Sequence, residues 1–187
     1  MRWPGVLAGE LAADFAIVEE GLPGRTAAVF DPAWPHYTGL PYLLPALESH
    51  APLDAVAIML GTNDVQESYG RSAAGIATDI AALAEIVVRS ACGPEAGTPY
   101  LLLVAPPPLG TLVGPLAEAS YGPGAQASRE LGTLLSAVAE AGGFGFLDAG
   151  TITSFSETDG FHLDASGHGA LGRAVADALR DALSERG

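Results

Sequence analysis

A near-continuous apolar run, Asp54–Leu60 (D-A-V-A-I-M-L), constrains the fold of this chain more than any other feature. A short run without alternating polar residues is typical of a parallel strand that is buried on both faces of its sheet. Two further apolar runs, Tyr100–Ala105 and Phe144–Asp148, follow at intervals long enough for a helix to lie between them. We therefore expect a mostly parallel sheet whose strands are connected through helices.

Helical patterns separate these strand candidates. Apolar residues recur at helical spacing in Ser72–Ser90 and in Gly167–Glu185, where Leu171, Val175 and Leu179 share one stripe. Strands that alternate with helices predict βαβ units with right-handed crossovers, and therefore a three-layer α/β/α domain. The other expected elements are a strand at Phe15–Glu19 and helices at Gly5–Ala13, Tyr42–His50 and Gln126–Ala141.

The length and charge of the chain limit its class and its partners. With 187 residues, we expect one domain over residues 1–187, and the 49% of hydrophobic residues suffice for a sizeable core. The net charge of −14 argues against nucleic acid and anionic membranes as partners. We find neither an apolar run long enough to span a bilayer nor a signal peptide, and we expect a cytoplasmic protein.

Cys92 is the only cysteine, so no disulfide can form within the chain. This fits a reducing compartment. Its context, S-A-C-G-P, is typical of the end of a helix. We expect Cys92 to be a small buried side chain rather than a catalytic nucleophile.

Functional residues of parallel sheets gather beyond the carboxyl ends of the strands. Four segments directly follow the strand candidates, and they should share one rim of the sheet. They are Gly21–Thr26, Gly61–Asp64, Ala105–Leu109 and Asp148–His162.

The last of these segments contains T-D-G-F-H, in which Asp159 precedes His162 by three residues. A carboxylate so close can accept the Nδ1–H of the imidazole and stabilise the imidazolium that forms when the ring takes a proton. This pattern predicts the general base of a nucleophilic hydrolase. The alternative is a solvated loop with a capping Asp before the last helix.

Two other rim segments offer hydrogen-bond donors. The side-chain amide of Asn63 in G-T-N-D and the backbone N–H of Gly24 in G-L-P-G-R-T could bind a developing oxyanion. Alternatively, the G-T-N-D segment is a turn in which Asn63 and Asp64 cap the following segment, and the Gly24 segment is a plain loop. For Arg25 we expect a salt bridge with Glu19 or Glu20.

Taken together, these residues resemble the SGNH (GDSL-type) hydrolases. The second block of that family matches around Gly24, the third matches G-T-N-D with Asn63, and the fifth matches D-G-F-H-L with Asp159 and His162. The segments E-E-G-L-P-G-R-T, I-M-L-G-T-N-D and V-A-P-P-P-L are most similar to the bacterial arylesterase/acyltransferase branch. The resemblance covers the chain from Arg2 to its last helix.

The resemblance implies a flavodoxin-like α/β/α fold and a Ser–His–Asp triad that acts on small acyl or aryl esters through an acyl-enzyme. It makes His162 the general base, Asp159 the residue that orients it, and Gly24 and Asn63 oxyanion donors. It implies a small-molecule ester as the partner and assembly into a homo-oligomer. We expect no cofactor and no metal.

The first block of the family, G-D-S-L with its nucleophilic serine, does not occur in these 187 residues. The resemblance places the missing strand between Phe15–Glu19 and Asp54–Leu60, each of which would then have an unpaired edge. Ser154 and Ser156 lie on the base-bearing loop itself, and we do not expect either to be the nucleophile. We expect the serine upstream of Met1, and no normal activity from residues 1–187 alone; a decayed copy is the alternative.

Other functions are also open at this point. One is a non-catalytic SGNH-like binding or structural module that has lost its nucleophile. Another is a metal-dependent phosphoesterase, which the spacing of the four histidines does not favour. Trp34 and Tyr37 are expected either to form pocket walls or to pack ordinarily. The histidines are His36, His50, His162 and His168, of which we expect the last to be structural or solvent-facing.

Overall fold

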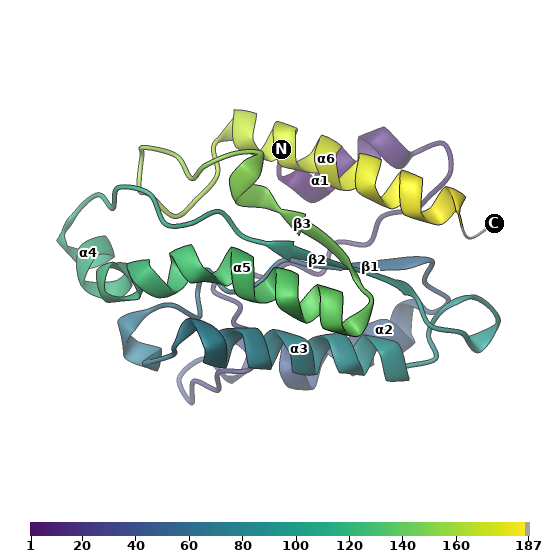
Figure 1. Cartoon of the computed structure of the whole chain (residues 1–187), viewed down its shortest axis with the longest axis horizontal. Helices are drawn as coiled ribbons and strands as arrows, with labels where there is room; N and C mark the ends of the chain where they lie inside the picture. Colours follow the sequence, from purple (N-terminus) through teal and green to yellow (C-terminus); the bar gives the residue numbers. More distant parts are fainter. Residues whose placement is uncertain (186–187) are drawn as a thin grey trace.

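In the computed structural model, which describes residues 1–185, a parallel three-stranded sheet lies between two layers of helices (Figure 1). The strands are adjacent in chain order, and Ala55 pairs with Tyr100 and Leu102 with Gly145. The predicted α/β class is confirmed. The strands are β1 (Ala55–Ile58), β2 (Tyr100–Ala105) and β3 (Gly145–Asp148).

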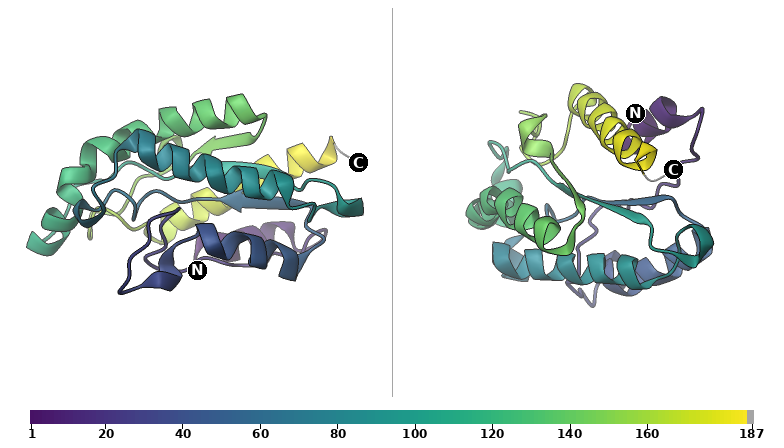
Figure 2. Two further views of the ribbon diagram at one scale, coloured as in Figure 1. Left: turned by 90° about the horizontal axis from the view of Figure 1, so that it is seen from below. Right: turned by 45° about the vertical axis from the view of Figure 1, so that its right-hand side comes forward.

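The helices divide between the two faces of the sheet (Figure 1, Figure 2). One face is covered by the first and last helices, which pack against each other, and the other face by three helices from the middle of the chain. The first pair is α1 (Trp3–Leu11) and α6 (Ala165–Ser184), and the second group is α2 (Leu40–His50), α3 (Ala73–Arg89) and α5 (Ala125–Gly142).

Strand β2 explains why both layers are needed. Its side chains alternate between the two cores, so that Leu101 and Leu103 pack towards α3 and α5 while Leu102 and Val104 pack towards α1 and α6. All four are at most 4% exposed. Because the side chains of a strand point alternately to opposite faces, an apolar residue at every position requires cover on both sides.

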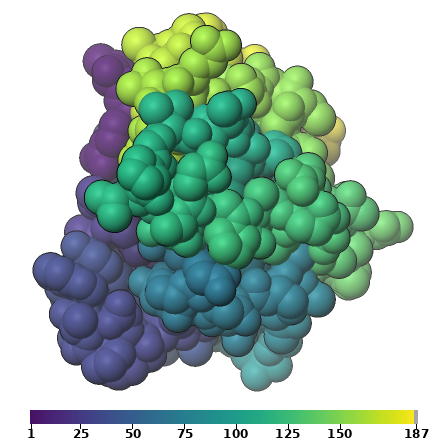
Figure 3. Space-filling view, turned by 90° about the vertical axis from the view of Figure 1, so that its left-hand side faces the viewer, coloured from purple at the N-terminus to yellow at the C-terminus, as the bar shows by residue number. Residues whose placement is uncertain are grey.

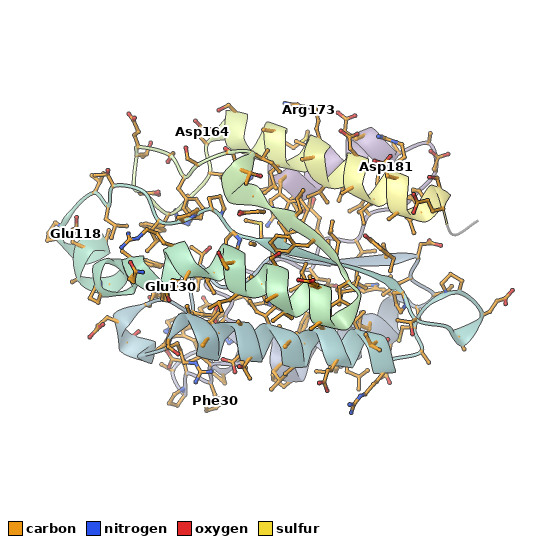
Figure 4. All side chains as sticks on the ribbon, viewed as in Figure 1. Phe30, Glu118, Glu130, Asp164, Arg173 and Asp181 are labelled. Carbon is orange, nitrogen blue, oxygen red and sulfur yellow. The ribbon has the colours of Figure 1, made fainter. Side chains whose placement is uncertain are left out.

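The stripe expected on the last helix is buried, with Leu171, Val175 and Leu179 in the core formed with α1. Arg173 and Asp181 lie on the outer side of α6, as Figure 4 shows. The amphipathic pattern therefore predicted the orientation of this helix correctly.

Capping residues define where two of the helices begin. Ser72 accepts a hydrogen bond from the Gly75 N–H at the start of α3 (3.1 Å), and Asp164 accepts one from the Gly167 N–H at the start of α6 (2.7 Å). Each cap satisfies a backbone donor that has no partner within the helix. The helices therefore start within two residues of the predicted positions.

The expected strand at Phe15–Glu19 is wrong. The segment belongs to no strand, although Phe15 and Ile17 pack against the core beneath α1 and α6. The three strands pair only with one another within residues 1–185, so the segment forms no ladder with any of them. A strand requires a hydrogen-bonding neighbour as well as a suitable sequence.

The sequence reading also missed a short helix, α4 (Pro115–Tyr121), between β2 and α5. Pro115 occupies its first position, where the missing N–H of proline is tolerated. Short 3-10 helices occur in the connections, at Pro35–Tyr37, Glu67–Tyr69, Pro94–Ala96, Gly122–Gly124 and Ala149–Thr151.

Two expectations for single residues are confirmed. Cys92 is 5% exposed. His168 is structural, because its Nδ1 accepts a hydrogen bond from the backbone N–H of Trp3 (3.2 Å) and so joins α6 to α1. Burial lowers the pKa of His168, which favours the neutral ring that this bond requires. In the described part of the chain, no helix is both long and apolar enough to cross a bilayer.

Candidate active site

The segments after the strands converge on one end of the molecule, which Figure 3 shows face on. A cleft there is lined by residues from the segment before α2, from the loops after β1 and β3, and by Tyr121 at the end of α4. Three of the four predicted rim segments contribute residues to this cleft, whereas Ala105–Leu109 contributes none. Gly24, Asn63 and His162 line this cleft together with Asp31, Trp34, Tyr37, Gln66, Ser68, Tyr69, Tyr121 and Phe161.

Asp159 and His162 form the pair expected from the sequence. Asp159 Oδ2 lies 2.8 Å from His162 Nδ1, and the side chain of His162 is 70% exposed, so its ring is open to the cleft. Asp159 Oδ1 accepts hydrogen bonds from the backbone N–H groups of Phe161 (3.0 Å) and His162 (2.9 Å). The Nδ1–H bond leaves Nε2 free to accept a proton.

The environment of Asp159 keeps it ionised. Burial by itself would raise the pKa of Asp159, but hydrogen bonds from Phe161 N–H and from the ring and backbone of His162 outweigh it and lower the pKa. The carboxylate is therefore charged at neutral pH and can stabilise a protonated His162. The capping Asp of the alternative is present, but it is Asp164, which caps α6, and Asp159 is left to pair with His162.

Gly160 allows the turn between the acid and the histidine. Its φ of +85° lies in the left-handed region, and a Cβ at this position would lie 2.4 Å from the carbonyl oxygen of Thr111. The loop after β2 is hydrogen-bonded to this turn, from Gly110 N–H to Gly160 C=O (2.8 Å) and from Val113 N–H to Asp159 C=O (3.3 Å). Through these backbone hydrogen bonds, the loop after β2 supports the turn that carries Asp159 and His162.

The side-chain amide of Asn63 is held on both sides. Its Nδ2 donates to the carbonyl oxygen of Arg25 (3.0 Å), and its Oδ1 accepts from the hydroxyl of Tyr121 (3.1 Å). An NH₂ group has two donors, so one N–H remains for a ligand in the cleft. The side chain of Asn63 does not cap the segment that follows, because the 3-10 helix Glu67–Tyr69 has Gln66 at its N-cap and no side-chain cap.

Gly24 lines the same cleft with a φ of +79°. A Cβ at this position would lie 3.0 Å from the ring of Tyr37, and the left-handed φ adds strain for any other residue, so the position favours glycine. Within residues 1–185, no acceptor takes the Gly24 N–H. Gly24 therefore provides a second free donor at the cleft.

Asp64, next to Asn63, is fully buried. Its Oδ1 accepts from the backbone N–H of Ala27 (2.8 Å), which fastens the segment of Gly24 to the loop after β1. Its Oδ2 has no partner among the described residues. Burial raises the pKa of Asp64 to about 6, because the ionised carboxylate is poorly solvated there.

The salt bridge expected between Arg25 and Glu19 or Glu20 is wrong. Glu19 pairs with Arg2 (2.6 Å), and Glu20 pairs with His50 (2.7 Å) and with the hydroxyl of Tyr42. The guanidinium of Arg25 lies 4.1 Å above the centre of the Tyr42 ring, in a cation–π arrangement. Only the backbone carbonyl of Arg25 contributes to the site.

Aromatic rings stand on two sides of the cleft. Trp34 stacks on Tyr37 at 5.5 Å between ring centres, and Tyr121 stacks on Phe161 at 4.6 Å. Trp34 is 52% exposed, so an ordinary packing role does not describe it. Phe30, on the same segment as Trp34, projects outward from the surface (Figure 4).

Two residues that shape the site were missed by sequence reasoning. Tyr121 lies 58 positions from Asn63 and ends a helix that was not predicted, so no local pattern connects them. Asp64 belongs to the G-T-N-D segment, where the sequence suggests no role for it other than capping the segment that follows. A buried aspartate directly after a strand was the available signal for it.

The four histidines do not form a metal site. Throughout residues 1–185, no group of three or more His, Cys, Asp or Glu side chains is placed to hold an ion. His50 pairs with Glu20, and His36 packs against Tyr37. The phosphoesterase reading therefore has no ligand set in this part of the chain.

Comparison with known proteins agrees with this fold and site. The profile of the GDSL-like Lipase/Acylhydrolase family matches residues 1–170. A carbohydrate acetylesterase from Sinorhizobium meliloti is 39% identical with a TM-score of 0.92, and the match covers 97% of this chain and 85% of that one. The inhibitor-bound aryl esterase of M. smegmatis is also 39% identical with a TM-score of 0.92, over 96% and 85% of the two chains.

A carbohydrate acetylesterase family member from Sinorhizobium meliloti is 34% identical, with a TM-score of 0.91 over 98% of this chain and 87% of that one. No curated protein sequence matches the chain. An α/β/α domain with an acid–histidine pair at the strand ends defines a class of hydrolases, and the chain belongs to the GDSL-like lipase/acylhydrolase family.

Proposed function

We propose that this protein is a serine-type ester hydrolase for small acyl or aryl esters, with His162 as its general base. The observation that carries the proposal is the cleft, in which the Asp159–His162 pair faces two free donors, the amide of Asn63 and the N–H of Gly24. A base and oxyanion donors in one site are the elements that acyl transfer from an ester requires.

The roles follow from the chemistry of each group. His162 Nε2 takes the proton of a serine hydroxyl as its oxygen attacks the ester carbonyl, and Asp159 stabilises the imidazolium. The N–H groups of Gly24 and Asn63 bind the oxyanion. The intermediate then expels the alcohol, which receives the proton from His162. Water, activated by His162, releases the acid from the serine, and an alcohol in its place would receive the acyl group.

We place the nucleophilic serine upstream of Met1. Within residues 1–185, no serine hydroxyl is hydrogen-bonded to the His162 ring. The similar esterases are longer, because the matches cover only 85% of their chains. One edge of β1 pairs with no strand within residues 1–185, which leaves a place for a further strand.

The substrate class rests on the relatives and on the cleft. The similar structures include an aryl esterase and a carbohydrate acetylesterase. The stacked pair of Trp34 and Tyr37 offers an aromatic surface beside the donors for the alcohol part of such an ester. We therefore propose acetyl esters of aryl alcohols or sugars as substrates.

The proposal includes assembly into a homo-oligomer. A shallow groove between α2 and α3 is lined by Leu44, Ala81 and Ile86, and Leu44 and Val88 are 40% and 39% exposed. A second copy of the chain would cover these apolar side chains. Light scattering is expected to give a mass above that of one chain.

The test is hydrolysis of p-nitrophenyl acetate by two forms of the protein, one with and one without the residues encoded in frame upstream of Met1. We expect turnover only in the longer form, and we expect His162→Ala to abolish it. If the longer form shows no His162-dependent turnover, the proposal is wrong. In that case, the alternative of a non-catalytic module is favoured, since no serine is bonded to His162 here.

A further inference from the structure

The amide of Asn63 can satisfy both of its partners in only one orientation. The carbonyl oxygen of Arg25 accepts but cannot donate, so the group that faces it at 3.0 Å must be the NH₂. The other end of the amide is then Oδ1, which needs a donor, and the hydroxyl of Tyr121 lies 3.1 Å away. The two contacts together exclude the flipped amide.

Tyr121 is well placed to act as a fixed donor. It is the last residue of α4, is 9% exposed, and stacks on Phe161, whose ring lies 4.4 Å from that of His162. Burial raises the pKa of Tyr121, and the nearby Tyr69 and Asp159 raise it further. The hydroxyl therefore keeps its proton at any pH at which the protein would work.

We propose that Tyr121 is a positioning residue for Asn63, and that its hydroxyl holds the amide with one N–H directed at the position of the oxyanion. Donation to Oδ1 also withdraws electron density from the amide nitrogen, so the free N–H becomes a stronger donor. The consequence for catalysis rests on the proposed function, whereas the orientation of the amide does not.

Asn63 is the only asparagine of the chain, which makes the orientation directly measurable. Selective ¹⁵N-asparagine labelling of residues 1–187 gives a single side-chain NH₂ signal pair in an NMR spectrum. Tyr121→Phe removes the hydroxyl and keeps the ring that stacks on Phe161. We expect this substitution to shift the two NH₂ signals of Asn63 by more than their line width. We also expect it to accelerate rotation about the C–N bond of the Asn63 side-chain amide.

Tyr100→Phe is the matched control, because Tyr100 begins β2, at the opposite end of the strand from the cleft. This variant should leave the Asn63 signals unchanged. Unchanged signals in Tyr121→Phe, with an unaltered thermal melt, would overturn the proposal.

In the form with turnover, Tyr121→Phe should lower kcat about tenfold and leave KM unchanged, because a neutral hydrogen bond has roughly that worth. In the Asn63→Ala background the same substitution should have no further effect. An equal loss in both backgrounds would overturn the proposal. If no form hydrolyses esters, the proposed function fails, whereas the NMR experiment still decides the role of Tyr121.

Discussion

The two sides of the cleft are built in different ways. The base side is local, because the hydrogen bonds of the Asp159 carboxylate reach only two or three residues along the chain. The donor side is assembled from a distance, since Asn63 bonds to residues 38 and 58 positions away and Asp64 to a residue 37 positions away. The base can therefore form from its own loop, whereas the donors depend on the whole rim of the sheet.

The largest expected effect comes from breaking the local side. In Asp159→Asn, Oδ1 can still accept from the two backbone N–H groups, but an NH₂ then faces His162 Nδ1. The ring must accept there and carry its proton on Nε2, where it cannot act as a base. We expect kcat for p-nitrophenyl acetate in the longer form to fall about 10⁴-fold.

The melting temperature of this variant should barely change, since the side chain of His162 is largely exposed. A large fall in the melting temperature of Asp159→Asn would show that the Asp159–His162 pair stabilises the fold rather than acting in catalysis.

Breaking the assembled side should have a smaller effect. Asn63→Ala removes one oxyanion donor, and we expect kcat to fall roughly 10²–10³-fold with little change in KM. Gln126→Ala is the control, because it removes an amide whose partners, Glu130 and Arg129, lie on the exposed face of α5. Wild-type turnover in Asn63→Ala would exclude this amide as a donor to the transition state.

A further test concerns how the local side is supported. Gly160→Ala places a Cβ against the backbone of Thr111 as well as straining a φ of +85°. Gly143→Ala introduces strain at a φ of +68°, where nothing lies within 4 Å of the new Cβ. We expect about 1 kcal/mol of destabilisation for Gly143→Ala and at least about twice that for Gly160→Ala, by urea unfolding. Equal effects would mean that the loop after β2 does not restrain the turn.

The smallest expected effect concerns Asp64, which fastens the donor side. Because its pKa in the folded protein, about 6, lies above the usual value of 3.8, its contribution favours folding at low pH and is lost as the pH rises through 6. Between pH 5 and 7.5 the loss amounts to about 1 kcal/mol. Asp64→Asn keeps the acceptor for Ala27 N–H and removes the titrating group.

From pH 5 to pH 7.5, the unfolding free energy of the wild type should therefore fall by about 1 kcal/mol relative to that of Asp64→Asn. Parallel pH profiles for the two proteins would contradict the raised pKa.

The same contrast separates what the sequence predicts from what it does not. The apolar runs and amphipathic stripes predict β1, β2, β3 and the five long helices, because these signals are local and repeated. The Asp159–His162 pair is predictable for the same reason. The segment of Phe15–Glu19 has a strand-like sequence but forms no ladder, because pairing also depends on a neighbour.

The contacts of Asn63 with Tyr121 and Arg25 could not be predicted from the sequence, because they join segments that only the folded sheet brings together. A hydroxyl 58 positions away has no periodic signal of its own. Their position after strand candidates supplied Gly24 and Asn63 as candidates, and the resemblance to a family supported them, whereas the structure supplied what holds Asn63 in place.

The most direct test of the account is covalent labelling of the longer form with diethyl p-nitrophenyl phosphate, followed by peptide mapping. We expect one modified serine, upstream of Met1, with labelling that is slowed strongly by His162→Ala and less strongly by Asn63→Ala. A label on a serine within residues 1–187, or labelling that His162→Ala leaves unchanged, would contradict the assignment of this cleft as the base and oxyanion side of an acyl-transfer site.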